Sequence, residues 1–504
     1  MFPQKLKDLL EGVGYKCLQG DDQVLVNDVV YDSRRVRPGC VFVCLIGSAV
    51  DSHQYAAQAV EAGAAAVVAS RQLELAKGTL VLVEDTRKAM AYMSAALFGH
   101  PAAKLKTVGI TGTKGKTTTA YYIKAILDVW EKKQQKVETG ILSSVDIYDG
   151  KEPEPAKMTT PEAIEIHRHI RNAADAGIRY LTMEVSSQAL KYKRVRGLKF
   201  DVGVFLNISE DHISPCEHEN FEDYFTSKLS LFKQTRVACV NLDSAEKERI
   251  LSASRIAERV VTFGTTGAPD IWGHDIEMHD GKISFRVRCD RFHEKFHLRM
   301  HGLFNVENAL AAIAAAYAYG VDVESMKEAL ASVQVKGRME EFESKDRNLV
   351  AIVDYAHNRL SFEKLYDSVY KEYPGYEIYT VFGCPGDKAL NRRRDLGLIS
   401  GLFSNRVYLT TDDPGTESVS RISEETGHYV EMVGCPCECI EDRALAIQDA
   451  GEKKTVVLVL GKGSEGRQRF GNLTYDCPTD SEMVRKSMNN YDRQTIRQKV
   501  SRRS

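Results

Sequence analysis

Residues 107–119 read Thr107-Val108-Gly109-Ile110-Thr111-Gly112-Thr113-Lys114-Gly115-Lys116-Thr117-Thr118-Thr119. An apolar run with strand character enters a glycine turn, and a lysine and three hydroxyl side chains follow it. Apolar residues then recur at helical spacing, at Ala120, Ile123, Ile126, Leu127 and Trp130. The stretch therefore predicts a strand, a loop and a helix in succession, which is the frame of an α/β domain.

The order of residues in this loop suits phosphate binding. Glycines let backbone N–H groups close on phosphate oxygens, and the N-terminus of the following helix adds partial positive charge. Lys116 can then reach the β- and γ-phosphates of a nucleotide, and Thr117 can bind Mg²⁺. The spacing departs from the common phosphate-loop pattern, because Ile110 stands where its first glycine would be. A plain glycine- and threonine-rich turn is the alternative.

Composition bounds the class of protein. The 504 residues carry a net charge of −2 with a pI near 6.7, which gives no electrostatic case for a nucleic-acid partner. The length predicts about three domains. The start of the chain lacks the apolar core of a signal peptide, and no 18-residue apolar run occurs, so we expect no membrane insertion.

Cysteine usage indicates the compartment. Eleven cysteines at irregular spacing are typical of reduced thiols in a cytoplasmic protein. Cys435, Cys437 and Cys439 lie within five residues and could form a soft-metal or redox site. No second ligand group at zinc-site spacing follows them, so structural or incidental thiols are favoured.

Short apolar runs predict sheets on both sides of the phosphate loop. Toward the N-terminus, residues 41–45, 65–69 and 80–83 read as strands, with a helix over 55–62. Toward the C-terminus, four β-branched runs predict a parallel sheet covered on both faces: Leu349–Asp354, Glu377–Phe382, Arg406–Leu409 and Thr455–Leu460. Residues 485–504 are polar and read as a helix or a frayed tail.

Polar side chains follow the predicted central strands. Glu184 ends the apolar run that begins at Tyr180, where a carboxylate would point into the crevice at the edge of a parallel sheet. Asp211 and His212 follow another strand, and a histidine there is more often structural than a ligand. The hydroxyls of Thr159 and Thr160 before Pro161 fit either a helix cap or a ligand contact.

These motifs together resemble the Mur ligases, and the phosphate loop also resembles that of the related folylpolyglutamate synthetases. Lys114 stands where those families usually have asparagine. The segment that begins Tyr31-Asp32-Ser33-Arg34-Arg35 resembles the uridine-nucleotide domain of the Mur ligases that add the third peptide residue. The remaining motifs follow in the order of the family: the phosphate loop, Glu184-Val185-Ser186-Ser187, Asp211-His212, Lys228, Gly337-Arg338-Met339-Glu340 and Asp354-Tyr355-Ala356-His357.

The resemblance implies a three-domain α/β fold. Residues 1–98 would form an N-terminal uridine-nucleotide-binding domain, 99–335 a central P-loop ATPase-like domain, and 336–504 a C-terminal Rossmann-like, amino-acid-binding domain with a polar tail. It also implies that Lys228 reacts with CO₂ to become a carbamate, which turns a cation into an oxygen ligand that suits Mg²⁺.

The resemblance implies four groups of site residues. It gives catalytic roles to Lys116, Glu184, His212 and Lys228, and Mg²⁺ binding to Thr117, Glu184, His212 and carbamylated Lys228. The ATP site would comprise Gly112, Thr113, Lys114, Gly115, Lys116, Thr117, Thr118, Asn305, Asn308, Arg338 and Asp354, although Asn305 and Asn308 also fit helix capping. The UDP-sugar site would comprise Tyr31, Ser33, Ser48, Thr159, Thr160, Ser186, Tyr192 and Arg194. The amino-acid site would comprise Arg393, Asp412, Asp413, Gly415, Gly461 and Glu465.

The implied activity is ATP-dependent ligation in peptidoglycan precursor synthesis. A third amino acid would be joined to UDP-N-acetylmuramoyl-L-alanyl-D-glutamate through an acyl phosphate. ATP, Mg²⁺ and the two small-molecule substrates would be the only partners, and we expect a monomer. A folylpolyglutamate-type ligase and a non-catalytic nucleotide-sugar-binding relative remain the alternatives.

Two departures from the family pattern bear on the amino acid. Enzymes that add meso-diaminopimelate carry Asp-Asn-Pro-Arg, whose arginine binds the distal carboxylate. This chain has Asp412-Asp413-Pro414-Gly415, in which glycine cannot make that contact and Asp413 would repel a carboxylate. Lys462-Gly463-Ser464-Glu465 also replaces Lys-Gly-His-Glu. L-lysine is therefore the favoured substrate, with L-ornithine and meso-diaminopimelate as alternatives.

Overall fold

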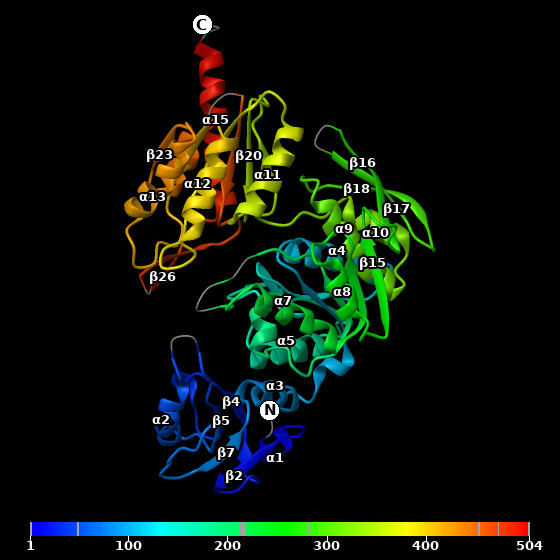
Figure 1. The fold of residues 1–504 in the computed structure, drawn as a ribbon, viewed down its shortest axis with the longest axis vertical. Coiled ribbons are helices and arrows are strands. Elements are labelled where there is room, and N and C mark those ends of the chain that lie inside the picture. Colours follow the sequence, from blue (N-terminus) through cyan, green and yellow to red (C-terminus); the bar gives the residue numbers. More distant parts are fainter. Residues whose placement is uncertain are drawn as a thin grey trace. The chain divides into compact units, whose positions relative to one another are not determined.

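The computed structural model describes residues 3–47, 50–210, 213, 217–279, 282–451, 454–471 and 473–501, with side chains as far as residue 495. It consists of two compact units, whose elements are labelled in Figure 1. The first unit holds Met1–Trp272 and Leu310–Met326, and the second holds Gly273–Ala309 and Lys327–Ser504. We describe each unit by itself.

The first unit begins with a five-stranded sheet in the order β2-β7-β6-β5-β4. Its strands are β2 (Tyr15–Gln19), β4 (Asp28–Val30), β5 (Cys40–Val43), β6 (Ala66–Ala69) and β7 (Thr79–Val83), and its helices are α1 (Leu6–Leu9), α2 (Ala56–Glu61) and α3 (Thr86–Leu97). The strands β1 (Gln4–Lys5) and β3 (Leu25–Val26) form a separate, antiparallel two-stranded sheet. Residues of β5 alternate between two cores, one shared with α3 and one with α2, as the two-residue period of a strand requires.

A larger, mainly parallel sheet of eleven strands follows, in the order β11-β10-β9-β12-β8-β13-β14-β15-β16-β17-β18. The first unit holds β8 to β15 and the first two residues of β16. The sheet's strands as far as β16 are β8 (Lys106–Thr111), β9 (Gly140–Leu142), β10 (Asp146–Tyr148), β11 (Glu154–Pro155), β12 (Tyr180–Glu184), β13 (Phe200–Phe205), β14 (Thr235–Asn241), β15 (Arg259–Gly264) and β16 (Ile271–His279). In the register of β8 with its two neighbours, Glu184 pairs with Ile110 and Phe205 with Thr111. The loops after these three strands therefore emerge at one edge of the sheet.

Helices cover this sheet. They are α4 (Lys116–Lys133), α5 (Ala163–Asp175), α6 (Ser187–Lys191), α7 (Phe221–Leu229) and α8 (Lys247–Ser254). Two later helices, α9 (Asn305–Tyr319) and α10 (Val323–Leu330), each have residues in both units. The predicted apolar face of α4 is confirmed, because Ala120, Ile123, Ile126 and Leu127 are buried.

The second unit contains the antiparallel strands β17 (Lys282–Arg288) and β18 (His293–Leu298) and a six-stranded sheet in the order β19-β20-β24-β21-β22-β23. The strands of the larger sheet are β19 (Glu340–Glu343), β20 (Leu349–Asp354), β21 (Glu377–Phe382), β22 (Arg406–Leu409), β23 (Cys437–Cys439) and β24 (Thr455–Leu460), all parallel except β19. The four strands predicted from β-branched runs have the expected bounds.

Helices and a hairpin complete the second unit. The helices are α11 (Arg359–Glu372), α12 (Asn391–Phe403), α13 (Val419–Met432), α14 (Arg443–Asp449) and α15 (Asp480–Ser501), and the hairpin pairs β25 (Arg467–Phe470) with β26 (Leu473–Asp476). Apolar cores lie on both faces of the sheet. The polar C-terminal segment is thus helical as far as Ser501.

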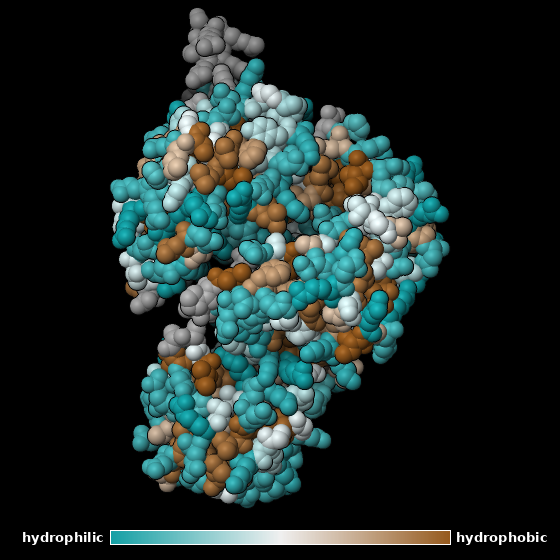
Figure 2. Space-filling view, viewed as in Figure 1, coloured by the Kyte–Doolittle hydropathy of each residue, from teal (hydrophilic) through white to brown (hydrophobic). Residues whose placement is uncertain are grey.

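The surface agrees with the composition. Figure 2 shows a mainly hydrophilic face with scattered apolar residues. None of the helices in the described ranges is long and apolar enough to cross a membrane.

The ten cysteines that the structure describes are all free thiols, and Cys435 is buried, which raises its thiol pKa. Burial likewise raises the pKa of Cys437 to about 12, so neither thiol is poised to ionise at neutral pH.

Candidate functional site

The phosphate loop joins β8 to α4, and its backbone is braced by Asn207, which follows β13. Asn207 Oδ1 accepts the Lys114 backbone N–H at 2.9 Å, and Asn207 Nδ2 donates to the Lys114 carbonyl at 3.2 Å. These two bonds use only backbone atoms of residue 114. They explain why a lysine is accommodated at this position of the loop.

Thr113 faces the protein. Its hydroxyl is buried and lies 3.1 Å from the hydroxyl of Tyr224 on α7 and 3.3 Å from the Ser209 carbonyl oxygen. Ser209 in turn donates its backbone N–H to Thr113 Oγ1 at 3.1 Å. The side chain of Thr113 therefore fastens the loop to α7, and its backbone N–H donates to the Asn207 carbonyl at 3.0 Å.

Two ammonium groups converge on the loop. Lys116 Nζ donates to the Gly112 carbonyl at 2.9 Å, and Lys228 Nζ, from α7, donates to the same carbonyl at 2.8 Å. Lys228 is 1% exposed and lies 4.6 Å from the centroid of the Tyr224 ring. A buried and a half-buried cation at a glycine loop create a local positive potential that suits phosphate.

A carboxylate and two hydroxyls meet beside these cations. Glu184 is buried at the end of β12, and its Oε2 accepts the Thr117 hydroxyl at 3.1 Å. Its Oε1 accepts the Ser144 backbone N–H at 2.7 Å, and Ser144 Oγ lies 2.9 Å from Thr117 Oγ1. Oxygen donors in this number fit a hard cation such as Mg²⁺. The structure thus brings together Thr117 and Glu184, whose joint role the sequence predicted.

Two of the expected ligands, His212 for the metal and Ser48 for the UDP-sugar, lie outside the described residues. Within the described ranges no group of three His, Cys, Asp or Glu side chains forms a metal site. Ser144 was missed from the sequence, although a hydroxyl pair directly after the apolar run 140–142 was a usable signal.

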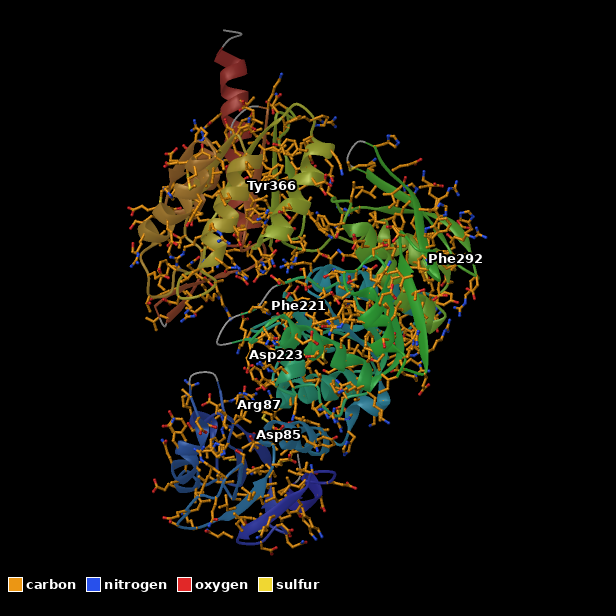
Figure 3. All side chains as sticks on the ribbon, viewed as in Figure 1. Asp85, Arg87, Phe221, Asp223, Phe292 and Tyr366 are labelled. Atoms are coloured by element: carbon orange, nitrogen blue, oxygen red, sulfur yellow. The ribbon has the colours of Figure 1, made fainter. Side chains whose placement is uncertain are left out.

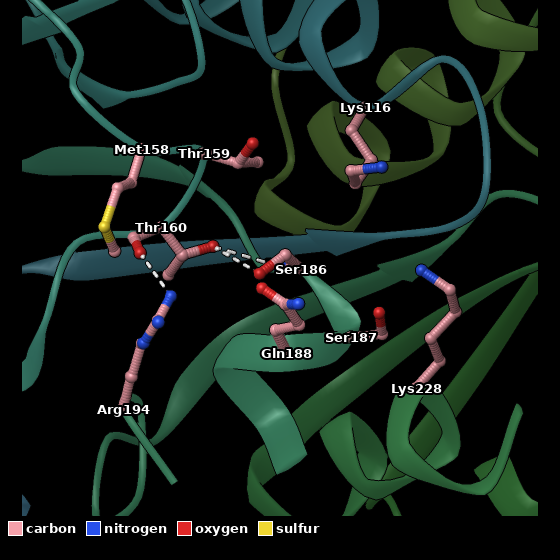
Figure 4. A pocket seen from close by; sticks show the side chains of 9 residues that line it. All are labelled: Lys116, Met158, Thr159, Thr160, Ser186, Ser187, Gln188, Arg194 and Lys228. Atoms are coloured by element: carbon pink, nitrogen blue, oxygen red, sulfur yellow. Dashed lines mark hydrogen bonds between the residues drawn. The ribbon is translucent and has the colours of Figure 1, made fainter. Parts of the chain in front are cut away.

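A cavity of about 190 Å³ opens beside the two cations (Figure 4). It is lined by Lys116, Met158, Thr159, Thr160, Ser186, Ser187, Gln188, Arg194 and Lys228. Thr160 Oγ1 donates to the Glu184 carbonyl at 2.9 Å and accepts the Ser186 backbone N–H at 3.0 Å. Arg194 donates to the Thr160 carbonyl at 3.1 Å. Phosphate-loop and substrate residues predicted from separate motifs therefore share one cavity, and Ser187 and Gln188 join them.

The helix-cap alternative for the threonine pair is wrong. Helix α5 begins at Ala163, and its N-cap residue is Glu162. Glu162 forms an ion pair with Arg194 at 2.8 Å. Thr159 and Thr160 are thus available to the cavity.

Tyr192 does not line the cavity. The guanidinium of Arg87 lies 4.5 Å from the centroid of its ring, and burial lowers the Arg87 pKa. Arg87 and Asp85 belong to the start of α3 and are labelled in Figure 3, and Lys193 donates to Asp85. This part of the expected UDP-sugar site therefore lies where the five-stranded sheet's domain meets the central sheet's domain.

A second cavity of about 150 Å³ surrounds Tyr31. Its lining includes Arg35 and Arg37 from the N-terminal sheet region and Glu165 and Arg168 from α5. Burial raises the pKa of Tyr31 to about 12, and its hydroxyl lies 3.5 Å from Glu165 Oε1. Ser33 begins the short 3₁₀ turn Ser33–Arg35 that follows Tyr31.

Four expected ATP residues belong to the second unit. Asn305 begins α9 and donates to the His301 carbonyl at 2.5 Å, and Asn308 donates to Asn305 Oδ1 at 2.9 Å. Arg338 lies 4.3 Å from the centroid of the Tyr355 ring. The Asp354 carboxylate, at the end of β20, accepts the backbone N–H groups of Met339 at 2.8 Å and of Ala356 at 2.7 Å. Asp354 thus orders the turn that carries Arg338.

The expected amino-acid residues cluster at the carboxyl ends of the second unit's parallel strands. Lys462 Nζ lies 3.1 Å from Asp413 Oδ1 and 3.7 Å from Glu465 Oε2. Burial raises the pKa of Asp412 to about 6, although Lys462 and Arg443 favour its ionised form. Gly461 follows β24, and a Cβ there would lie 2.6 Å from Asp412 Oδ2.

Gly415 and Arg393 are constrained by neighbouring carboxylates. Gly415 has a φ of +59°, and a Cβ there would lie 2.0 Å from Asp387 Oδ2. Asp387 accepts the backbone N–H of Thr416 at 2.8 Å. Arg393 is buried, and its guanidinium donates to Glu417 and to Glu425 at 2.7 Å each. Arg393 is therefore bound to two acidic side chains of the protein.

Phosphate loop, paired cations and a carboxylate–hydroxyl pair on a parallel sheet define an enzyme that uses a nucleoside triphosphate. Three family models match the chain: the Mur ligase family catalytic domain at residues 26–103, the Mur ligase middle domain at 110–316, and the Mur ligase glutamate ligase domain at 337–463.

Curated relatives extend over almost the whole chain. The UDP-N-acetylmuramoyl-L-alanyl-D-glutamate–2,6-diaminopimelate ligase of Caldanaerobacter subterraneus is 34% identical over 93% of this chain and 96% of its own. The UDP-N-acetylmuramyl-tripeptide synthetases of Lactobacillus acidophilus and Bifidobacterium longum are 34% and 37% identical, over 92% and 87% of both chains respectively. This chain belongs to the Mur ligase family and is an ATP-dependent ligase of peptidoglycan synthesis.

Solved structures share the three-domain fold. A UDP-N-acetylmuramoyl-L-alanyl-D-glutamate–2,6-diaminopimelate ligase superposes with a TM-score of 0.67 at 23% identity and covers 97% of this chain and 99% of its own. The MurF ligase of Thermotoga maritima in complex with ADP has a TM-score of 0.59 at 19% identity, with coverages of 93% and 99%. The expected three-domain α/β fold is thereby confirmed.

Proposed function

We propose that this ligase joins a diamino acid, L-lysine in the first place, to the terminal carboxylate of UDP-N-acetylmuramoyl-L-alanyl-D-glutamate. One observation carries the proposal: Lys116 of the phosphate loop and Lys228 line the same cavity as Thr160, Ser186 and Arg194. A phosphate donor and a carboxylate acceptor could therefore meet there. The names of the curated relatives, which specify this sugar-dipeptide or a tripeptide product, support the same substrate.

The ATP half of the reaction rests on the loop. Residues 112–115 and the start of α4 would surround the phosphates, while the Thr113 and Lys114 N–H groups hold the loop to Asn207. Lys116 Nζ would leave the Gly112 carbonyl for a phosphate oxygen. Thr117 and Glu184, together with His212 and carbamylated Lys228, would hold Mg²⁺. Bound Mg²⁺ offsets charge on the transferring phosphoryl group. Asn305, Asn308, Arg338 and Asp354 would complete the nucleotide site.

Lys228 is suited to carbamylation. Its amine is buried and enclosed by the Gly112 carbonyl and the Tyr224 ring. In the uncharged state its nitrogen would attack CO₂, a C–N bond would form, and a proton would pass to solvent. The carbamate oxygen would then carry the negative charge that a Mg²⁺ ligand requires.

The chemistry follows in two steps. The glutamate carboxylate oxygen attacks the γ-phosphorus of ATP, the bond to the bridging oxygen breaks, and ADP leaves. The amine of the incoming amino acid then attacks the acyl carbon, phosphate departs with the former carboxylate oxygen, and the amine gives up a proton. Thr159, Thr160, Ser186 and Arg194 would orient the acceptor carboxylate, which is the main contribution that positioned side chains make to such a transfer.

The uridine end of the substrate would occupy the cavity at Tyr31. Its arginines suit a diphosphate, and the half-buried Tyr31 ring offers a flat face to a base. Ser33 and Ser48 would lie nearby. Tyr192, packed against Arg87, would contact the part of the substrate that lies between the two cavities.

Acidic side chains support L-lysine as the amine donor. Asp412, Asp413 and Asp387 gather near Gly415 and Gly461, and Arg393 is already bound by Glu417 and Glu425. A side-chain ammonium is favoured in such surroundings, and a second carboxylate is not. L-ornithine and meso-diaminopimelate are the alternatives, and the relatives named for 2,6-diaminopimelate make the latter a direct test.

The proposal also includes the cellular compartment and the oligomeric state. An enzyme that uses ATP and a nucleotide sugar, with free thiols, would act in the cytoplasm as a monomer, with no nucleic-acid partner. The match to the N-terminal family model disfavours a folylpolyglutamate-type ligase, and the intact Lys116 and Glu184 disfavour a non-catalytic role.

The test is phosphate release with ATP, Mg²⁺ and UDP-N-acetylmuramoyl-L-alanyl-D-glutamate, supplying L-lysine, L-ornithine and meso-diaminopimelate separately. We expect turnover with L-lysine, its loss in Lys116→Met, and its retention in Lys132→Met, an exposed position on the same helix. Turnover with meso-diaminopimelate alone would overturn the choice of amino acid. Absence of phosphate release with all three amino acids would overturn the assignment of UDP-N-acetylmuramoyl-L-alanyl-D-glutamate as the acceptor.

A further inference from the structure

Two histidines outside the ligase site face each other in the second unit. His274 lies on β16 and His293 begins β18, next to Phe292, which Figure 3 labels. Their Nε2 atoms are 3.2 Å apart, and the two ring planes are inclined at 45° with centroids 5.2 Å apart. A direct contact of this kind needs a proton on one Nε2 and a lone pair on the other.

A carboxylate orients the first ring. Asp275 Oδ2 lies 3.2 Å from His274 Nδ1 and 3.8 Å from Arg286 Nε. Successive side chains of a strand normally point to opposite faces, but Asp275 has a φ of +47°, which turns its carboxylate back toward its neighbour. The carboxylate favours the tautomer with hydrogen on Nδ1, so the lone pair of His274 lies on Nε2 and faces His293.

We propose that His274 and His293 form a two-histidine site for a divalent transition metal, with Zn²⁺ and Ni²⁺ as the representative ions. Two nitrogens bound at about 2.0–2.1 Å to a tetrahedral ion stand roughly 3.3 Å apart. The observed separation of 3.2 Å already matches this spacing, so an ion can enter with little rotation of either ring. The Asp275–His274 pair supplies the outer carboxylate that metal-binding histidines commonly have.

The site differs in chemistry from the ligase centre. Imidazole nitrogens select borderline ions such as Zn²⁺, Ni²⁺ and Cu²⁺, whereas Mg²⁺ takes oxygen ligands. Among the described residues no group of three His, Cys, Asp or Glu side chains is placed to hold a metal ion, so water would complete the coordination. Because the ligands belong to β16 and β18, which flank β17 in the sheet order, a bound ion ties these two strands together.

Metal binding to the full-length, tag-free, chelator-stripped chain tests the site. We expect isothermal titration with Zn²⁺ or Ni²⁺ at pH 7.5 to show one equivalent whose affinity falls at least tenfold in His274→Ala and in His293→Ala. His297→Ala is the matched control, because His297 is an exposed residue of the same strand and should leave the affinity unchanged.

A second readout guards against loss of folding in the variants. Thermal unfolding should move to higher temperature with Zn²⁺ in the unaltered chain and in His297→Ala, and should not move with Zn²⁺ in His274→Ala, while all three retain the same ATP-dependent phosphate release. A thousandfold excess of Mg²⁺ should leave the Zn²⁺ isotherm unchanged. Absence of Zn²⁺ and Ni²⁺ binding, or equal binding by the two alanine variants and the unaltered chain, would overturn the proposal.

Discussion

Replacing Gly337 by alanine tests how the loop that carries Arg338 is held. Gly337 has a φ of +64°, and a Cβ there would lie 2.3 Å from the Ser464 backbone nitrogen and 2.7 Å from the Gly463 carbonyl carbon. Both obstacles are backbone atoms, so rotation of a side chain cannot relieve the overlap. The two loops would have to separate.

The magnitude can be bounded with a matched variant. Gly375 has a φ of +84° and no atom within 4 Å of its ideal Cβ, so Gly375→Ala carries only the strain of a left-handed residue, about 1–2 kcal/mol. Gly337→Ala carries the same strain and an overpacking penalty of roughly 1–3 kcal/mol. We therefore expect Gly337→Ala to lower the free energy of unfolding by about 1–3 kcal/mol more than Gly375→Ala.

A functional effect should accompany the loss of stability. Arg338 stacks on Tyr355, and the Tyr355 hydroxyl donates to Glu465 at 2.7 Å, so separation of the two loops displaces the guanidinium. A displacement near 1 Å can lower kcat/KM for ATP by about a hundredfold. Urea unfolding and steady-state phosphate release measure the two effects. Equal unfolding midpoints for both variants, with unaltered kcat/KM, would refute the reasoning.

Three further predictions concern a metal ligand, the amino-acid pocket and acid stability. Glu184→Gln keeps an acceptor for the Ser144 N–H but loses the charge, so phosphate release should fall by about a hundredfold or more with little change in the unfolding midpoint. Gly415→Arg alone should not confer turnover with meso-diaminopimelate, because Asp387 fills the Cβ position, whereas Gly415→Arg with Asp387→Gly should; comparison of initial rates with both amino acids decides this. Burial lowers the pKa of His167 to about 4, so the folded state disfavours its protonated form. Stability is therefore full above about pH 6.5 and falls toward pH 4, by up to roughly 3 kcal/mol. Urea titrations should show that His167→Leu removes this part of the pH dependence.

Much of the fold was predictable because local sequence and burial agree. The strands β20, β21, β22 and β24 are β-branched runs bounded by polar residues, and every residue of β24 is buried. The face of α4 was predictable for the same reason, since its apolar residues recur at helical spacing. In both cases the signal lies within one segment of the chain.

The bracing of the site could not be predicted, because it joins segments far apart in the sequence. Asn207 holds the phosphate loop from 93 residues away, and Ser144 meets Glu184 across 40 residues. Thr113 was expected to serve ATP, but its side chain turns to Tyr224. The direction in which a polar side chain points depends on the register of neighbouring strands, and this register cannot be read from a single sequence.

The departures from the family pattern at Lys114 and at Gly415 have opposite physical meanings. At residue 114 the two bonds to Asn207 use backbone atoms, so exchange of the side chain leaves these bonds intact. At residue 415 the missing side chain has been replaced by another group, because the Asp387 carboxylate lies where a Cβ would be. Under the proposed function, a pocket with an anion at the point where the diaminopimelate-adding enzymes carry a cation would prefer a side-chain ammonium. The departure at Gly415 therefore bears on the amino acid that is added, whereas the departure at Lys114 does not.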